Sequence, residues 1–128
     1  MVTWNDYKAM AKSRGALALE LYVVESTPQK SPQDVKDSLP SHLAYQRDLE
    51  KRSILVLAGP LSDPTGETMV GAGLIIYRAG SMDDARQLAK DDPMHQSGAR
   101  SFTLRKWLVN EGSLSLNVGL STGTVVLY

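Results

Sequence analysis

Three apolar segments in the first two thirds of the chain have the pattern of buried strands. The first, ALALELYVVES (16–26), lies between Gly15 and the turn-rich segment TPQKSPQD. The second is SILVLAGPL (53–61) and the third is MVGAGLIIYR (69–78); between them lies SDPTGE (62–67), whose turn residues suit a hairpin loop. Short apolar runs bounded by turn residues are typical of buried strands. We therefore predict one buried strand and, further along the chain, an antiparallel pair.

Two short helices are predicted from capping residues and from apolar residues at helical spacing. Near the N-terminus, Thr3 can accept a hydrogen bond from the amide of Asp6, and Gly15 ends the helix that follows. Ser81 starts another helix in the same way. The segment DDP (91–93) stops this helix, because a residue before proline is disfavoured in the α conformation.

A further helix is predicted between the first and second strands. It should begin somewhere between Asp34 and Ser41, because Pro40 fits the first turn of a helix but not its interior. Helical spacing then places several side chains on one face, which should point inward: Leu39, His42, Leu43 and Leu49.

Two segments in the C-terminal third alternate between apolar and polar residues, as strands with one wetter face do. The segment ARSFTLRKWLVN (99–110) alternates only partly, with a shift in phase, through Phe102, Leu104, Trp107 and Val109. The segment SLSLNVGLS (113–121) alternates strictly, and STG can turn from it into a last strand, TVVLY. We expect Trp107 and also Tyr45 to be packing residues rather than platforms for a ligand.

The order of predicted elements, without the first helix and the tail, is β-α-β-β-α-β. This order is that of the ferredoxin-like split βαβ fold, an α+β architecture with a four-stranded antiparallel sheet and two helices on one face. We expect a single domain over 1–128, with a core at about 16–110 and a C-terminal β extension at 113–128. The other face of the sheet needs a cover. Two such sheets packed face to face in a homodimer, as a dimeric α+β barrel, would supply it.

Composition narrows the classes of partner and of chemistry. Fourteen basic and fourteen acidic residues cancel, so no long-range field attracts nucleic acid or an anionic membrane, and neither is expected as a partner. No apolar run is long enough for a membrane span, and the first residues lack the pattern of a signal peptide, so we expect a cytoplasmic protein. Without cysteine, any chemistry must come from histidine, carboxylates, hydroxyls or backbone amides.

Four motifs, in order along the chain, carry a resemblance to a known family. They are PSHLAYQRDLE (40–50), LVLAGPL (55–61), SMDDARQLAKDDPM (81–94) and RKWLV (105–109). Together they resemble the YCII-related (YciI-like) family, whose pattern is an HLxYL-type helix, an AGPL strand, an EEA-like helix and a DP-aromatic turn. The resemblance covers roughly 16–109. It departs from the family at Met94, where an aromatic residue is usual, and at 39–41, where the arginine often found before the HL motif is absent.

The resemblance implies a recurrent polar pair, which falls here on His42 and Asp92. An imidazole titrates near neutral pH, and a carboxylate within hydrogen-bond reach fixes its tautomer and supports the imidazolium. His42 would then be a general base and Asp92 the group that orients it. Characterised relatives include dehydrochlorinases, so the resemblance implies a cofactor-independent lyase or isomerase acting on a small cyclic oxygenated compound. The alternative for the pair is a buried histidine that a carboxylate satisfies for structural reasons.

Other residues are candidates for substrate binding. Gly59 removes a side chain where a ligand or another backbone can approach, and Pro60 removes a donor from the strand, so the strand should bend there. Arg47 and Arg100 could bind a carboxylate or phenolate, although arginines more often form surface pairs. His95 is expected at the rim of the cleft or on the surface.

Two other functional classes stay open at this stage. A non-catalytic module could use the same cleft, with His42 and Asp92 serving recognition or stability. A metal-dependent enzyme would need His42, Asp92 and His95 to converge, but these residues do not follow a known ligand spacing, and we expect neither a metal nor a cofactor.

Overall fold

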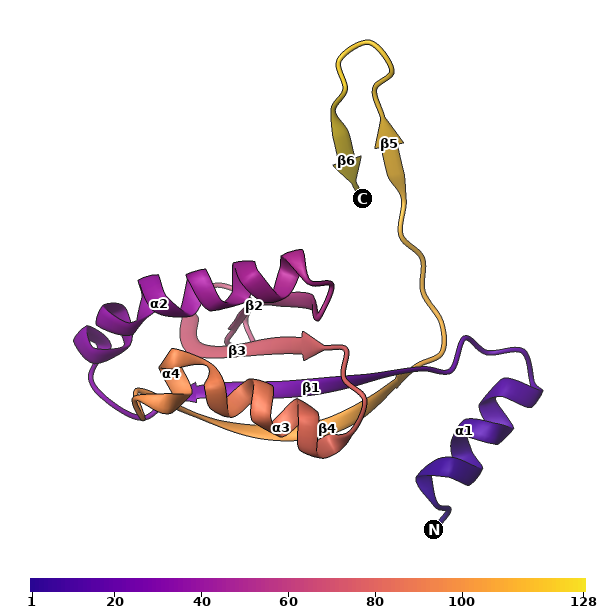
Figure 1. The fold of residues 1–128 in the computed structure, drawn as a ribbon, viewed down its shortest axis with the longest axis horizontal. Coiled ribbons are helices and arrows are strands. Elements are labelled where there is room, and N and C mark those ends of the chain that lie inside the picture. Colours follow the sequence, from indigo (N-terminus) through magenta and orange to yellow (C-terminus); the bar gives the residue numbers. More distant parts are fainter. The chain divides into compact units, whose positions relative to one another are not determined.

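The computed structural model describes all residues, 1–128, and the chain forms two compact units (Figure 1). The smaller unit combines 1–19 with 108–128, and the larger unit is 20–107. The expectation of one domain over the whole chain stays a prediction.

The larger unit holds almost all of a four-stranded sheet and three helices (Figure 1). In chain order the elements are β1 (Leu19–Pro28), α2 (Pro32–Lys51), β2 (Leu55–Ser62), β3 (Met69–Tyr77), α3 (Met82–Asp91), α4 (Pro93–Gln96) and β4 (Arg100–Val109). The strand order is β2-β3-β1-β4, and β3 pairs antiparallel with both β2 and β1. This arrangement confirms the predicted ferredoxin-like α+β fold.

The core lies between one face of the sheet and the helices. The register pairs Tyr22 with Tyr77, Val24 with Ile75 and Ser26 with Gly73, so these residues share a face. The buried cluster on that face joins strand and helix residues: Tyr22, Val24, Ile75 and Tyr77 with Leu49, Ala85 and Ala89. Figure 1 shows α2, α3 and α4 on the same side of the sheet.

Helix α2 begins earlier than the sequence pattern predicts. Ser31 is its N-cap, with Oγ accepting a hydrogen bond from the amide of Asp34 at 3.2 Å, and Pro32 occupies the first turn. The predicted start between Asp34 and Ser41 is therefore wrong, and Pro40 lies inside the helix. An internal proline costs about 3 kcal/mol, and the packing of a 20-residue helix offsets this cost.

The DDP segment does end α3, at Asp91, as predicted. The chain then starts a new helical turn at once, because Asp92 is the N-cap of α4 and Pro93 takes its first position. This turn was not predicted. It fixes the backbone on both sides of Asp92.

Strand β4 alternates regularly, without the predicted shift in phase. Phe102 and Leu104 pack against the core. Trp107 falls on the other face and is 45 % exposed, so its prediction as a packing residue is wrong. Tyr45 does pack against the core, and its hydroxyl donates to the carbonyl of Leu88 at 2.7 Å.

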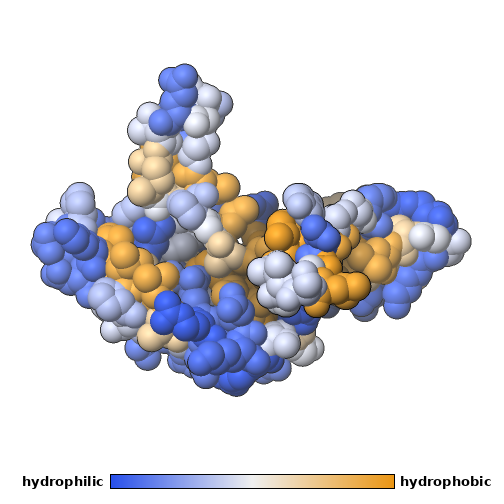
Figure 2. All heavy atoms as spheres, turned by 90° about the horizontal axis from the view of Figure 1, so that it is seen from above, coloured by the Kyte–Doolittle hydropathy of each residue, from blue (hydrophilic) through white to orange (hydrophobic).

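The smaller unit contains α1 (Trp4–Ser13) and an antiparallel hairpin of β5 (Leu116–Val118) and β6 (Val125–Leu127). Thr3 caps α1 by accepting a hydrogen bond from the amide of Asp6 at 3.2 Å, and Gly15 follows its end with φ at 86°. Every residue of β5 and β6 is exposed. Figure 2 shows apolar side chains on an otherwise largely hydrophilic surface. None of the helices is both long and apolar enough to span a membrane.

Candidate functional site

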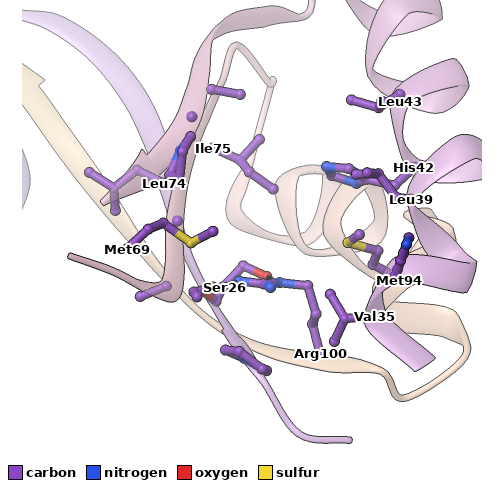
Figure 3. Close-up of a pocket in the computed structure, with 18 of the residues that line it drawn as sticks. Ser26, Val35, Leu39, His42, Leu43, Met69, Leu74, Ile75, Met94 and Arg100 are labelled. Atoms are coloured by element: carbon purple, nitrogen blue, oxygen red, sulfur yellow. Dashed lines mark hydrogen bonds between the residues drawn. The ribbon is translucent and has the colours of Figure 1, made fainter. Parts of the chain in front are cut away.

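A cavity of about 770 Å³ opens in the larger unit. Its lining is mostly apolar, which suits a small organic ligand. Figure 3 shows Leu39 and Leu43 of α2 facing Ile75 of β3 across this cavity, with Met94 of α4 beside them. These two leucines are 41 % and 44 % exposed, so this part of the predicted inward face borders the cavity, whereas Leu49 of the same face packs in the core.

His42 projects from α2 into the cavity lining (Figure 3). Its Nδ1 lies 2.9 Å from Oδ1 and 2.8 Å from Oδ2 of Asp92. A carboxylate only accepts hydrogen bonds, so Nδ1 carries the proton that points at Asp92. The remaining nitrogen of a neutral ring, Nε2, then keeps its lone pair. The structure thus brings together the two residues that the sequence analysis paired.

Asp92 is buried behind His42 and does not line the cavity. Its side chain is 0 % exposed, and Oδ1 also accepts a hydrogen bond from the amide of Met94 at 3.0 Å. One carboxylate therefore caps α4 and holds the imidazole ring. A buried charge is tolerated only when it is paired and hydrogen-bonded, and both conditions are met here.

Two tyrosines, Tyr45 and Tyr77, lie near enough to Asp92 for its charge to affect their pKa. Burial, with the nearby charges of Asp91 and Asp92, raises the pKa of Tyr45 to about 12. Burial also raises the pKa of Tyr77, and Asp92 adds to the effect. Both phenols therefore stay protonated at neutral pH. The hydroxyl of Tyr77 is buried and has no hydrogen-bond partner.

A second polar network joins Ser26 of β1 to two residues much later in the chain, His95 and Arg100. His95 Nδ1 lies 2.8 Å from the carbonyl oxygen of Ala89, and Nε2 lies 2.7 Å from Oγ of Ser26. Arg100 donates from Nε to the same Oγ at 2.8 Å. Burial lowers the pKa of His95, which favours the neutral ring. Ser26 and Arg100 line the cavity, whereas His95 lies behind Ser26.

Glycine and proline shape the strand side of the cavity. Gly59 and Pro60 both belong to the lining, and the register with β3 shifts between Pro60 and Ser62, in keeping with the predicted bend. The close approach of backbones occurs at Gly73, where an added Cβ would lie 3.2 Å from the carbonyl oxygen of Gly59. Gly71 has φ at 95°, and a Cβ there would lie 2.7 Å from the ring of Pro28.

The remaining candidates do not reach the cavity. Arg47 is exposed on α2 and is not part of the lining. His95 uses both ring nitrogens on protein groups, so it does not join His42 and Asp92 around a common point. The structure contains no cluster of three or more residues suited to hold a metal ion.

Sequence reasoning missed Ser26 and the second role of Asp92. Ser26 ends the apolar run ALALELYVVES, in phase with Tyr22 and Val24, which was a signal for an inward polar residue. For Asp92, the signal was an aspartate directly before Pro93, the sequence of an N-cap followed by proline at N1.

Comparison with known proteins gives a consistent result. The model of the YCII-related domain matches residues 20–108. An uncharacterized protein of Bacillus subtilis, YjpA, is 26% identical over 72 residues, which cover 56% of this chain and 78% of that protein. The solved structure of 5-chloro-2-hydroxyhydroquinone dehydrochlorinase from Burkholderia phenoliruptrix AC1100, in complex with 2,5-dihydroxybenzoquinone, is similar with a TM-score of 0.55. The identity to it is 20%, and the match covers 68% of this chain and 92% of that one.

The matched segment begins within β1 and ends within β4, so it takes in almost the whole sheet, the helix that carries His42 and the cap residue Asp92. The fold, its strand order and the family match agree. This chain belongs to the YCII-related family.

Proposed function

We propose that this chain is a cofactor-independent lyase or isomerase in which His42 removes a proton from a small cyclic oxygenated compound. The observation that carries the proposal is the pair itself. His42 lines a cavity while both oxygens of the buried Asp92 hold its Nδ1. A base oriented in this way, at the border of a mostly apolar hollow, suits general base catalysis.

The chemistry balances without a cofactor. Nε2 of His42 accepts a proton from the substrate, and the electrons of that bond form a new double bond within the ring. In an elimination, a leaving group such as chloride departs with its bonding electrons. In an isomerisation, the proton returns to another atom of the same molecule. Asp92 stabilises the imidazolium that exists between these steps and keeps the ring in place.

The cavity and the similar solved structure together support the substrate class. Apolar side chains from several elements leave room for a flat ring, and His42 supplies a polar group at the edge of this room. The similar structure is a dehydrochlorinase with 2,5-dihydroxybenzoquinone bound. Chlorinated hydroxyhydroquinones and lactones are therefore the first compounds to test.

The test compares turnover by the wild type and by His42→Asn. An asparagine amide can still donate to Asp92 but is not a base, so the fold keeps its polar contact while the chemistry is lost. Chloride release from 5-chloro-2-hydroxyhydroquinone and a panel of related compounds should fall by about 10²- to 10⁴-fold. Arg47→Gln, an exposed change on the same helix, is the matched control and should keep full activity. Unchanged turnover by a folded His42→Asn would refute the proposal.

A second candidate, a non-catalytic module that binds a small ligand, is favoured by one observation. Asp92 caps α4 as well as holding His42, so the pair also serves the fold. This candidate predicts ligand binding without turnover for every compound in the panel. It also predicts that His42→Asn changes affinity alone.

We also propose a homodimer as the functional form. Leu57 and Trp107 are 59 % and 45 % exposed on the sheet face away from the helices, and the hairpin of β5 and β6 exposes further apolar side chains. Exposed apolar faces of this kind favour association. Light scattering at micromolar concentration should give the mass of two chains, and a monomer would refute this part of the proposal.

A further inference from the structure

The guanidinium of Arg100 is partly buried and has no anionic group in direct contact. Its guanidinium donates from Nε to Oγ of Ser26 and from Nη2 to the carbonyl oxygens of Ser26 and Gly71. All three contacts are neutral acceptors, and no carboxylate lies within ion-pair distance. Burial lowers the pKa of Arg100, but a guanidinium stays charged at neutral pH. The charge of Asp92 offsets part of this effect from beyond ion-pair distance, so the partly buried guanidinium has only neutral hydrogen-bond partners.

Each hydrogen bond around Ser26 has a defined donor and acceptor. The carbonyl oxygen of Ala89 only accepts, so Nδ1 of His95 carries a proton, and Nε2 of the neutral ring must accept. The hydroxyl proton of Ser26 therefore points at His95. This leaves the lone pairs of Oγ for Nε of Arg100. Two other elements thus hold the guanidinium by its Nε and Nη2 edge.

The third nitrogen of the guanidinium, Nη1, has no partner in the protein. Arg100 lines the cavity, and Figure 3 shows its side chain extending from β4 toward Ser26, apart from His42 on α2. The charged side chains of the lining are Lys30, Lys36 and Arg100, and no aspartate or glutamate is among them. The charged side chains that line the cavity are therefore all positive, although the net charge of the chain is zero.

We infer that the ligand of this cavity is an anion, a ring compound with a carboxylate or an ionised phenol, and that Nη1 of Arg100 binds the anionic group. Ser26 and His95 are positioning residues, which act by holding Arg100. The inference rests on the proposed function in using the same cavity, and it adds a fixed point for the substrate away from the base. Such a point would orient the ring so that one chosen proton faces His42.

The wild-type protein alone gives the first test. Benzoate and benzamide have nearly the same shape and differ in charge, so they serve as probes, with binding followed by ligand-observed NMR at millimolar concentration. A charge-assisted hydrogen bond in a partly buried site should make benzoate bind about 10- to 100-fold tighter than benzamide. Equal binding of the two probes, or no binding of benzoate, would overturn the inference.

Variants then locate the anion. Arg100→Gln should remove the preference for benzoate. Arg100→Lys keeps the positive charge but not the planar set of guanidinium donors, so it should retain only part of the preference. Arg47→Gln controls for the loss of one arginine and should behave as the wild type. Full preference in a folded Arg100→Gln variant, checked by circular dichroism, would refute the assignment.

Ser26→Ala and His95→Gln test the positioning role. Each should lower the ratio of benzoate to benzamide affinity several-fold, whereas a general loss of structure would weaken both probes together and contradict the role. This test is independent of the test of the proposed function. His42→Asn should leave the ratio of benzoate to benzamide affinity unchanged. The experiments can therefore find an anion site without proton transfer, or proton transfer without an anion site.

Discussion

Replacing His42 with alanine should lower the stability far more than the loss of one partly exposed ring would, because the buried charge of Asp92 then loses its side-chain hydrogen-bond donor. The carboxylate is 0 % exposed, and its remaining hydrogen bond is the one from the amide of Met94. Removing the donor from a buried charged acceptor leaves that acceptor unsatisfied, which costs about 3 kcal/mol or more. Since domains of this size are stable by only about 5–15 kcal/mol, this is a large share of the total.

A second substitution, at Asp92, should restore part of the lost stability. In the double variant His42→Ala with Asp92→Asn, the amide oxygen can still cap α4, but no charge is buried. The second substitution should therefore restore at least about 1–2 kcal/mol, a gain that is unusual for a buried change. His42→Asn should stay within about 1 kcal/mol of the wild type, because its amide can donate to Asp92.

Urea unfolding at neutral pH, followed by far-ultraviolet circular dichroism, measures these differences. With an m-value of about 1–3 kcal/mol/M, a loss of 3 kcal/mol lowers the midpoint by at least about 1 M. Leu43→Ala is a suitable control, because Leu43 lies next to His42 and is 44 % exposed. The reasoning fails if His42→Ala unfolds at the same midpoint as the wild type, or if the double variant is no more stable than His42→Ala.

Two further predictions concern groups beside the site. Tyr77→Phe should leave stability unchanged or raise it by up to about 1 kcal/mol, because the hydroxyl that it removes is buried without a partner; a clear loss in thermal unfolding would show that this hydroxyl is satisfied. Burial lowers the pKa of His95 from its usual 6.5. As the pH falls below 6.5, the unfolded chain therefore binds a proton at His95 that the folded chain does not. The free energy of unfolding should fall with the pH until the folded-state pKa is reached. His95→Gln should weaken this dependence as the pH falls below about 6.5, and an identical pH profile of the unfolding midpoint would contradict it.

Much of the fold follows from local patterns in the sequence. The apolar runs that end at Ser26 and begin at Met69 are strands, and His42 lies on the helix face expected for it. The pairing of His42 with Asp92 came from the resemblance to a family. The two residues are 50 positions apart, so no local sequence pattern could have predicted their contact.

Other features depend on long-range contacts that the sequence does not display. Ser26 meets Arg100 across 74 residues and His95 across 69, and only the folded sheet brings them together. The start of α2 was misjudged because the rule against internal proline is local, whereas the packing that overrides it is not. Trp107 was misjudged because the phase of a strand is set by its neighbours in the sheet.

Pro40 gives the two ends of α2 different mechanical properties. Without an N–H, Pro40 leaves the carbonyl of Lys36 short of its usual helical bond, so the helix bends there at lower cost. Val35 and Leu39, which line the cavity, come before Pro40 in the helix, and His42 comes after it. This part of the lining can thus adapt to ligands of different shape while the imidazole of His42 keeps its hydrogen bond to Asp92.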